Sequence, residues 1–428
     1  MGLGLLGRGV GDVKYLAECG ADLTVTDLKT DEELADSVAQ LKQFRDIKFV
    51  LGEHRLEDFN NCDFILKAAG VPLDSPYIAE AKKNNIPIRM SADLFAEISG
   101  ITCIGVTGTR GKSTVAHMLY AIVKEAGKLV LFGGNVRGVS TLALLKEVTP
   151  EHIAILELDS WQLQGFREAG MSPNIAVFTT LYPDHMNYYG NNLDAYLADK
   201  ANIFLYQKPA DTLILGKQCA ATIIEKYGDK IDSKTLVVDE TKFPDTWTLR
   251  IPGLHNRYDA ALALATARIS GIPDDISRQA LESFKGVPGR LELIREVRGI
   301  KVYNDTTATT PEATLAALSA LGAENTVIVA GGTDKGLELG GLVTGLKSVK
   351  HVVLLAGSGT KRIVGSLQEA GDSKIYGPYD SLAPAVAKAF ELAEPGDNIL
   401  FSPAFTSFGM FKNEFDRGDQ FNAIVQKL

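Results

Sequence analysis

The sequence predicts an α/β fold whose sheets are mainly parallel. Short β-branched or apolar runs alternate with amphipathic stretches of helix length along the whole chain, as successive strand–helix–strand units require. The 428 residues suffice for two or three domains of the usual size, about 100–200 residues each. The 41 glycines outnumber the 16 prolines and are spread along the chain, which favours tight turns between strands and helices over a disordered tract.

Three segments follow one another, and we place them at residues 1–93, 94–290 and 291–428. The first segment contains a glycine-rich turn at residues 2–7 and strand-like runs at 23–27 and 62–66. Such a turn normally follows a strand. Either that first strand is missing from this numbering or the start is atypical.

The second segment opens with an apolar strand at residues 101–106, and a helix is predicted over 112–126. Val115, Met118, Leu119 and Ile122 recur at helical spacing and would share one face of that helix. A further strand is expected at 153–156. The third segment alternates strands at 301–303, 326–330, 351–356 and 398–401 with helices at 311–321 and 360–370.

The charge balance limits the classes of partner. A net charge of −9 and a pI near 5.3 argue against general affinity for nucleic acid or anionic membranes. No apolar run reaches the roughly 18 residues that a membrane span needs, and no charged-then-apolar leader opens the chain. Cys19, Cys62, Cys103 and Cys219 are isolated and lack metal-ligand spacing. We therefore expect a reduced, cytoplasmic protein.

The strongest motif is a phosphate-binding loop between the strand at 101–106 and the helix that follows. Its glycines let backbone N–H groups face phosphate oxygens, its lysine reaches the β- and γ-phosphates, and a hydroxyl can ligate Mg²⁺. Val106 stands where the strict motif has glycine. The loop predicts that the protein binds ATP and uses the γ-phosphate to form a covalent bond. The expected ATP-contacting residues are Gly108, Thr109, Arg110, Gly111, Lys112, Ser113 and Thr114.

A second nucleotide motif lies in the first segment. Gly2, Gly4 and Gly7, with Asp27 twenty residues further on, are spaced as in dinucleotide-binding turns. The turn could hold NAD, another nucleotide diphosphate, or no ligand. A separate nucleotide site in an ATP-using enzyme indicates a substrate that carries a nucleotide.

Three charged residues of the second segment are candidates for metal binding. Glu157 ends a strand beside the phosphate loop, where a carboxylate suits Mg²⁺, although a solvated acid is the alternative. His185 follows another strand end and reads as a metal ligand or a structural histidine. Lys200, on a helical stretch, reads by itself as a surface lysine.

Three polar motifs complete the set: residues 253–256 (GLHN), 304–306 (NDT) and 331–336 (GGTDKG). The first two read as helix caps or as polar contacts to a ligand. The third could bind a phosphate or a carboxylate.

In this order, the motifs resemble those of the Mur ligases over essentially the whole chain. The residues from Phe401 to Gly418 are similar to the branch that uses D-glutamate. The resemblance implies three domains: a Rossmann-like N-terminal domain for a UDP moiety, a central P-loop ATPase-like domain and a C-terminal Rossmann-like domain that brings the amino acid. It also implies an ATP- and Mg²⁺-dependent amide ligase of peptidoglycan precursor synthesis. This enzyme would add D-glutamate to UDP-N-acetylmuramoyl-L-alanine through an acyl phosphate.

The resemblance assigns roles by position. It implies catalytic roles for Lys112, Glu157, His185 and Lys200. Two Mg²⁺ sites would use Ser113, Glu157, His185 and Lys200, the lysine as its carbamate. ATP would also contact Asn256, Arg290 and Asp305. The UDP substrate would contact Leu5, Leu6, Asp27, Gly70 and Asn135. The amino acid would contact Thr309, Lys335, Ser407, Phe411 and Phe415.

Departures from the family pattern leave alternatives open. Thr307 stands where lysine is frequent, and Gly289 where histidine is usual. The same chemistry on L-glutamate or on another nucleotide-sugar peptide is the nearest alternative. An NAD-dependent oxidoreductase and a non-catalytic nucleotide-binding protein are more remote. We expect a monomer that handles small-molecule substrates, serves cell wall biogenesis, cell shape and division, and binds no nucleic acid.

Overall fold

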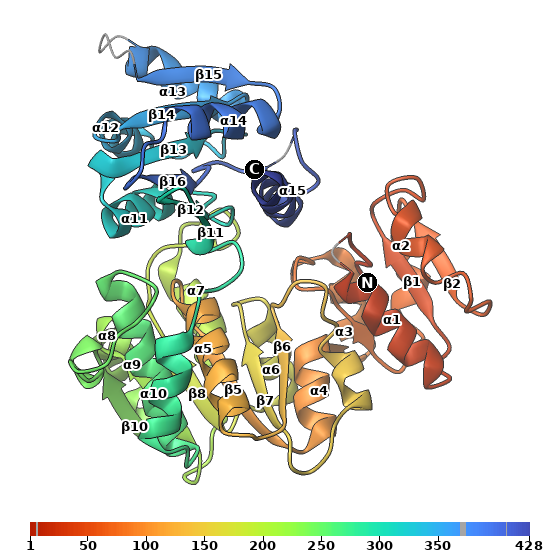
Figure 1. Cartoon of the computed structure of the whole chain (residues 1–428). Helices are drawn as coiled ribbons and strands as arrows, with labels where there is room; N and C mark the ends of the chain where they lie inside the picture. The colour runs from red at the N-terminus through yellow and green to blue at the C-terminus, as the bar shows by residue number, and fades with distance from the viewer. Residues whose placement is uncertain (6, 369–373, 408) are drawn as a thin grey trace. The chain divides into compact units, whose positions relative to one another are not determined.

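The computed structural model describes residues 1–5, 7–368, 374–407 and 409–428. The chain forms two compact units (Figure 1). The first comprises Met1–Thr248 and Arg257–Glu282, and the second comprises Leu249–Asn256 and Ser283–Leu428. None of the helices in the described ranges combines the length and apolar character that a membrane span requires.

A six-stranded, all-parallel sheet dominates the first unit. Its strand order is β10-β9-β8-β5-β7-β6, so the order reverses beside β5. In open α/β sheets, ligands bind at the carboxyl ends of the strands at such a reversal. The strands are β5 (Thr102–Thr107), β6 (Val130–Gly134), β7 (Ile153–Glu157), β8 (Ile175–Phe178), β9 (Thr212–Gly216) and β10 (Lys234–Val238).

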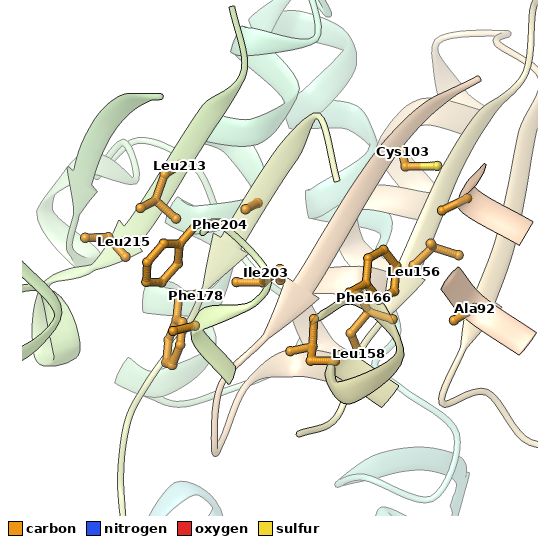
Figure 2. Close-up of a cluster of buried hydrophobic side chains, with 14 of the residues drawn as sticks. Ala92, Cys103, Leu156, Leu158, Phe166, Phe178, Ile203, Phe204, Leu213 and Leu215 are labelled. Atoms are coloured by element: carbon orange, nitrogen blue, oxygen red, sulfur yellow. The ribbon is translucent and has the colours of Figure 1, made fainter. Parts of the chain in front are cut away.

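Helices cover both faces of this sheet. α5 packs on β5, β6 and β7, while α4 and α6 pack on each other. Figure 2 shows the apolar cluster in which Phe166, Leu158 and Leu156 meet the side chain of Ala92. The helices along this part of the chain are α4 (Ser91–Ser99), α5 (Lys112–Glu125), α6 (Gln162–Ala169), α7 (Leu193–Ala201), α8 (Lys217–Tyr227), α9 (Leu254–Ile269) and α10 (Asp274–Ser283).

The first 90 residues add two short parallel pairs, β1 with β2 and β3 with β4. Met1 and Gly2 lie between the pairs: the N–H of Gly2 donates to Thr26 O at 2.8 Å, and the amine of Met1 donates to Leu66 O at 2.9 Å. The glycine turn is therefore held by both pairs. The elements are α1 (Arg8–Glu18), β1 (Thr24–Asp27), α2 (Ala35–Ala39), β2 (Lys48–Leu51), β3 (Ile65–Leu66), α3 (Pro76–Lys83) and β4 (Ile88–Arg89).

The second unit is a six-stranded sheet in the order β11-β12-β16-β13-β14-β15, parallel except for β11. Alternate residues of each strand face opposite layers. α11, α12 and α13 share one apolar cluster with the sheet, and α14 and α15 share the other. The elements are β11 (Glu292–Val297), β12 (Ile300–Asn304), α11 (Pro311–Leu321), β13 (Thr326–Ala330), α12 (Gly340–Lys347), β14 (His351–Leu355), α13 (Ser358–Gln368), β15 (Ile375–Tyr379), α14 (Leu382–Leu392), β16 (Asn398–Phe401) and α15 (Glu414–Lys427).

The predicted elements can be compared directly with these bounds. The α/β class with mainly parallel sheets is confirmed, as are α11, β13 and β16 at the predicted residues. The apolar face predicted for α5 is buried at all four positions. The run at 62–66 forms only the two-residue strand β3, because its first residues are polar and exposed. The predicted end of the helix at 360–370 lies outside the described residues.

Candidate active site

The phosphate-binding loop lies between β5 and α5, at the carboxyl edge of the sheet. Gly108 and Gly111 have φ values of 139° and 86°, a region that favours glycine. A Cβ at Gly108 would lie 2.0 Å from Thr179 Oγ1 and 2.8 Å from the backbone nitrogen of Thr180. The glycine is therefore needed both for its backbone angle and for this close approach to the chain after β8.

Lysine and hydroxyl side chains line the inside of the loop. Lys112 Nζ donates to the carbonyl oxygens of Gly108 and Thr109, at 2.9 and 3.1 Å. Thr109 is buried, and its hydroxyl donates to Tyr182 O at 3.0 Å. Lys112 is thus folded over the turn that the motif assigns to phosphate, while Arg110 is exposed.

Glu157 lies beside the phosphate loop, as the sequence predicts. Ser113 Oγ, in the first turn of α5, donates to Glu157 Oε1 at 2.9 Å, although the two residues are 44 positions apart. Glu157 ends β7 and is 4 % exposed, so the reading as a solvated acid is wrong. A hydroxyl and a carboxylate side by side are the hard oxygen donors that Mg²⁺ prefers.

Lys200 approaches the same loop from α7. It is 1 % exposed, so the reading as a surface lysine is also wrong. Its Nζ donates to Gly108 O at 2.9 Å and to Thr107 Oγ1 at 3.2 Å, and lies 4.9 Å from the ring centroid of Tyr196. Burial, followed by the charge of Lys112, lowers the pKa of Lys200 well below its usual value, which favours the neutral amine.

His185 lies beyond the end of β8. Its φ of 54° is unusual for a residue other than glycine, and its ring is 4.5 Å from that of Trp161. Burial lowers the pKa of His185, while Asp184, whose Oδ2 is 3.8 Å from Nε2, opposes this shift. The buried indole nitrogen of Trp161 has no hydrogen-bond partner among the described residues. Sequence reasoning gave Trp161 no role of its own.

The described residues contain no group of three or more His, Cys, Asp or Glu side chains arranged to hold a metal ion. Of the four predicted metal ligands, a hydrogen bond joins only Ser113 and Glu157 among the described residues. Lys200 as an amine is not a ligand for Mg²⁺. Only the oxygen atoms of Ser113 and Glu157 are therefore placed to bind a metal ion in the described ranges, unless Lys200 is converted to its carbamate.

A separate cavity of about 770 Å³ lies at the glycine turn of the first 90 residues. Leu5 and Gly70, two of the residues predicted to contact the UDP substrate, line this cavity. Asp27 lies behind it, accepting from the N–H of Gly4 at 3.0 Å and of Lys29 at 2.9 Å. Asp27 therefore holds the turn in place. Leu6 lies outside the described residues.

Asn135 connects to this cavity through Arg8, a residue that sequence reasoning missed. Arg8 Nη1 donates to Asn135 Oδ1 at 2.8 Å, and Arg8 lines the cavity. Four residues further along α1, Asp12 accepts from the hydroxyls of Ser91 and Ser140, at 2.8 and 2.6 Å. These contacts tie α1 to the chain around Asn135.

The remaining residues predicted for ATP belong to the second unit. Asp305 is buried and accepts from Leu291 N at 3.0 Å and Ser402 Oγ at 2.7 Å. Burial raises its pKa to about 7, against the smaller effects of these bonds and of Arg290. Asn256 Nδ2 donates to Pro252 O at 2.6 Å.

Most residues predicted for the amino acid follow strand ends of the second unit. Lys335 Nζ donates to Thr309 Oγ1 at 3.3 Å, while Ser407 is buried and its carbonyl accepts from Phe411 N at 3.1 Å. Phe415 is in the first turn of α15, where its N–H donates to Asn413 Oδ1 at 3.0 Å.

Arg417 is a third residue without a predicted role, after Trp161 and Arg8. It is fully buried in α15 and donates to Thr306 O at 2.7 Å and Phe405 O at 3.1 Å. It therefore joins the loops after β12 and β16, which carry Thr309 and Ser407. Only its place in a family-like motif could have drawn attention to it.

The two departures from the family pattern contact each other. Thr307 donates to Gly289 O through its N–H at 3.0 Å and its hydroxyl at 2.9 Å. Gly289 has a φ of 71°, and a Cβ there would lie 2.9 Å from Thr306 Cγ2. A histidine here would be strained at this φ and would require Thr306 to shift.

A parallel sheet that carries a phosphate loop, with a buried carboxylate at the next strand end, defines a nucleotide-using α/β enzyme. Three family models cover most of the chain. They are the Mur ligase MurD-like N-terminal domain at residues 1–90, the Mur ligase middle domain at 106–251 and the Mur ligase glutamate ligase domain at 289–405. The three-domain architecture is thereby confirmed, while the predicted boundaries after residues 93 and 290 stay predictions.

Relatives and solved structures agree with these matches. The UDP-N-acetylmuramoylalanine–D-glutamate ligases of Roseiflexus sp. (strain RS-1) and Borreliella afzelii (strain PKo) are each 36% identical to this chain. The alignments cover 100% of this chain and 98% and 97% of theirs. The crystal structure of UDP-N-acetylmuramate–alanine ligase MurC from Thermotoga maritima shares the fold, with a TM-score of 0.61, 18% identity, and 100% of this chain and 98% of that chain covered. The chain belongs to the Mur ligase family and is an ATP-dependent ligase.

Proposed function

We propose that this enzyme adds D-glutamate to UDP-N-acetylmuramoyl-L-alanine, with cleavage of ATP to ADP and phosphate. The relatives that bear this activity in their names match the chain over its whole length, at 32–36% identity. The observation that carries the proposal is the pair Ser113–Glu157 behind the phosphate loop. A buried carboxylate on the hydroxyl of the metal-binding position is the arrangement that Mg²⁺-dependent use of ATP requires.

The reaction has two chemical steps. A carboxylate oxygen of the substrate attacks the γ-phosphorus, the bond to the β-phosphate oxygen breaks, and ADP leaves. The neutral amine of the amino acid then attacks the acyl carbon, loses a proton, and expels phosphate. Lys112 and the loop N–H groups would neutralise charge on the transferred phosphoryl group.

Mg²⁺ fits this site through Ser113 and Glu157, and it would supply charge neutralisation at the phosphates when bound. We assign a further contact to His185. Lys200 has the properties that carbamate formation requires, because only an uncharged amine attacks CO₂ and burial favours that form. The product would place an anion beside Gly108 in place of the amine, and with it provide the oxygen donors that the described residues lack.

The resemblance to the family also supports roles for residues at the UDP, ATP and amino-acid sites. We propose that Leu5, Leu6, Asp27, Gly70 and Asn135 form the UDP-substrate site. ATP contacts would extend from residues 108–114 to Asn256, Arg290 and Asp305. Thr309, Lys335, Ser407, Phe411 and Phe415 would hold the amino acid. We also propose that the enzyme works as a monomer in the cytoplasm.

The test is release of phosphate from ATP by the purified chain with Mg²⁺ and UDP-N-acetylmuramoyl-L-alanine, adding D-glutamate, L-glutamate and other amino acids in turn. We expect release only with D-glutamate, and one new amide product by mass. Release with L-glutamate instead would support the alternative that Thr307 and Gly289 suggest. No release with any amino acid would refute the proposed reaction.

A further inference from the structure

Lys67 is a buried cation that the function described so far does not use. It follows β3, is 2 % exposed, and donates through Nζ to the carbonyl oxygens of Val71 and Ala68, at 2.7 and 3.2 Å. No carboxylate lies within ion-pairing distance of Lys67 in the ranges that the structure describes. Burial lowers its pKa to about 8, and only the more distant Asp159 and Asp199 oppose this.

A buried ammonium normally has a carboxylate or another anion as its partner, because carbonyl dipoles compensate only part of the charge. Lys67 lines the 770 Å³ cavity at the glycine turn. The loop that it bonds packs on that turn: a Cβ at Gly2 would lie 2.9 Å from Ala68 Cβ and 3.1 Å from Val71 Cγ2. Lys67 is thereby held next to the glycine turn, and the cavity that both line has room for an anion.

Arg8 supplies a second cation to the same cavity. It is the first residue of α1, whose N-terminus has no side-chain cap and no acidic residue in its first turn. Its guanidinium donates to the neutral side-chain oxygen of Asn135 at 2.8 Å. A helix N-terminus and an arginine with no carboxylate partner in the described ranges both favour an anion at this point.

The acids that line the cavity form no ion pair with Lys67 or Arg8 in the ranges that the structure describes, although the charge of Arg8 is close enough to lower the pKa of Asp12. Asp12 accepts from two serine hydroxyls, and Asp58 forms an ion pair with Arg55 at 2.8 Å. Asp22, Glu57 and Asp63 are exposed. Neither Lys67 nor Arg8 therefore has a carboxylate within ion-pairing distance among the described residues.

We propose that Lys67 and Arg8 bind the diphosphate of the uridine nucleotide, Lys67 from the end of β3 and Arg8 from the start of α1. This inference rests on the proposed function for the identity of the nucleotide. Two unpaired cations match the charges of a diphosphate better than a single carboxylate, and the glycine turn leaves room for phosphate to approach the backbone.

The experiment compares UDP with uridine, by isothermal titration calorimetry on the full chain. Lys67→Gln removes the charge but keeps N–H donors for the two carbonyl groups. We expect UDP to bind this variant about tenfold to a hundredfold more weakly, while uridine binds within about twofold of the wild type. Arg8→Met should act in the same way, and Lys67→Arg should restore part of the UDP affinity.

Lys48 is the matched control. It lines the same cavity, but its Nζ already lies 3.6 Å from Asp58 Oδ1, so Lys48→Met should leave the UDP-to-uridine ratio unchanged. Equal weakening of UDP and uridine in Lys67→Gln would indicate a purely structural role and overturn the inference, as would no weakening. If the wild type releases no phosphate in the ligase assay and binds UDP no more tightly than uridine, the proposed function itself fails. An active wild type with an unchanged ratio in both charge variants would refute only the diphosphate contacts.

Discussion

Replacing Gly108 by alanine should damage the phosphate loop far more than the same change at a glycine with open surroundings. A Cβ at Gly108 would lie 2.0 Å from Thr179 Oγ1, 2.8 Å from Thr180 N and 3.0 Å from Thr180 O. The last two atoms are backbone and cannot turn away. Gly127 has a φ of 68° and nothing within 4 Å of the same position, so Gly127→Ala is the control.

The expected loss in the free energy of unfolding has two parts. Both variants place alanine at positive φ, at about 1–2 kcal/mol. Only Gly108→Ala adds an overpacked contact, typically about 1–3 kcal/mol. We therefore expect Gly108→Ala to unfold with a free energy about 1–3 kcal/mol lower than that of the control.

Activity should separate the two variants further. Gly108 O accepts hydrogen bonds from both Lys112 and Lys200, at 2.9 Å each, so displacement of the loop moves both side chains. A shift of about 1 Å in a catalytic group can lower the rate about a hundredfold. The assays are urea unfolding and phosphate release at saturating ATP. Equal stability and equal activity of the two variants would refute this account of the loop.

Three further predictions test other parts of the molecule. Lys200→Ala should abolish phosphate release and regain part of it with short carboxylic acids that replace the carbamate; full activity without them would exclude that role. Because burial raises the pKa of Asp305 from 3.8 to about 7, its protonated form is favoured on folding. The free energy of unfolding should therefore fall by up to about 4 kcal/mol from pH 4 to pH 7 relative to Asp305→Asn; parallel pH profiles would contradict this. Arg417→Met leaves the carbonyls of Thr306 and Phe405 without donors and should destabilise by about 2–6 kcal/mol in urea unfolding, whereas a change below 1 kcal/mol would be unexpected.

Much of the fold could be predicted because local patterns agree with the tertiary structure. β13 and β16 are apolar runs bounded by turn residues, and both are buried in the middle of their sheet. α11 begins at a proline in its first turn, which the sequence displays directly. β3 was overestimated because its first residues, although next to an apolar pair, remain exposed.

The candidate site also contains some residues that local patterns predict and others that they do not. The phosphate loop is contiguous, and a carboxylate at the next strand end follows from the parallel sheet, so Ser113 and Glu157 were accessible to prediction. Local patterns indicated neither Lys200 nor Lys67, because a lone lysine is normally solvated and only the tertiary fold buries it. Lys200 was predicted only through the family resemblance. The pairing of Gly289 with Thr307 likewise depends on a turn whose geometry no local pattern specifies.

The central claim is that the substrate carboxylate attacks the γ-phosphate of ATP. An ¹⁸O label in that carboxylate tests this claim most directly. UDP-N-acetylmuramoyl-L-alanine labelled with ¹⁸O in its free carboxylate is turned over with ATP, Mg²⁺ and D-glutamate, and the released phosphate is analysed by mass spectrometry. Attack of that carboxylate on the γ-phosphate predicts one ¹⁸O in each phosphate released. Phosphate without the label, in a reaction that still forms the amide, would contradict the acyl-phosphate route.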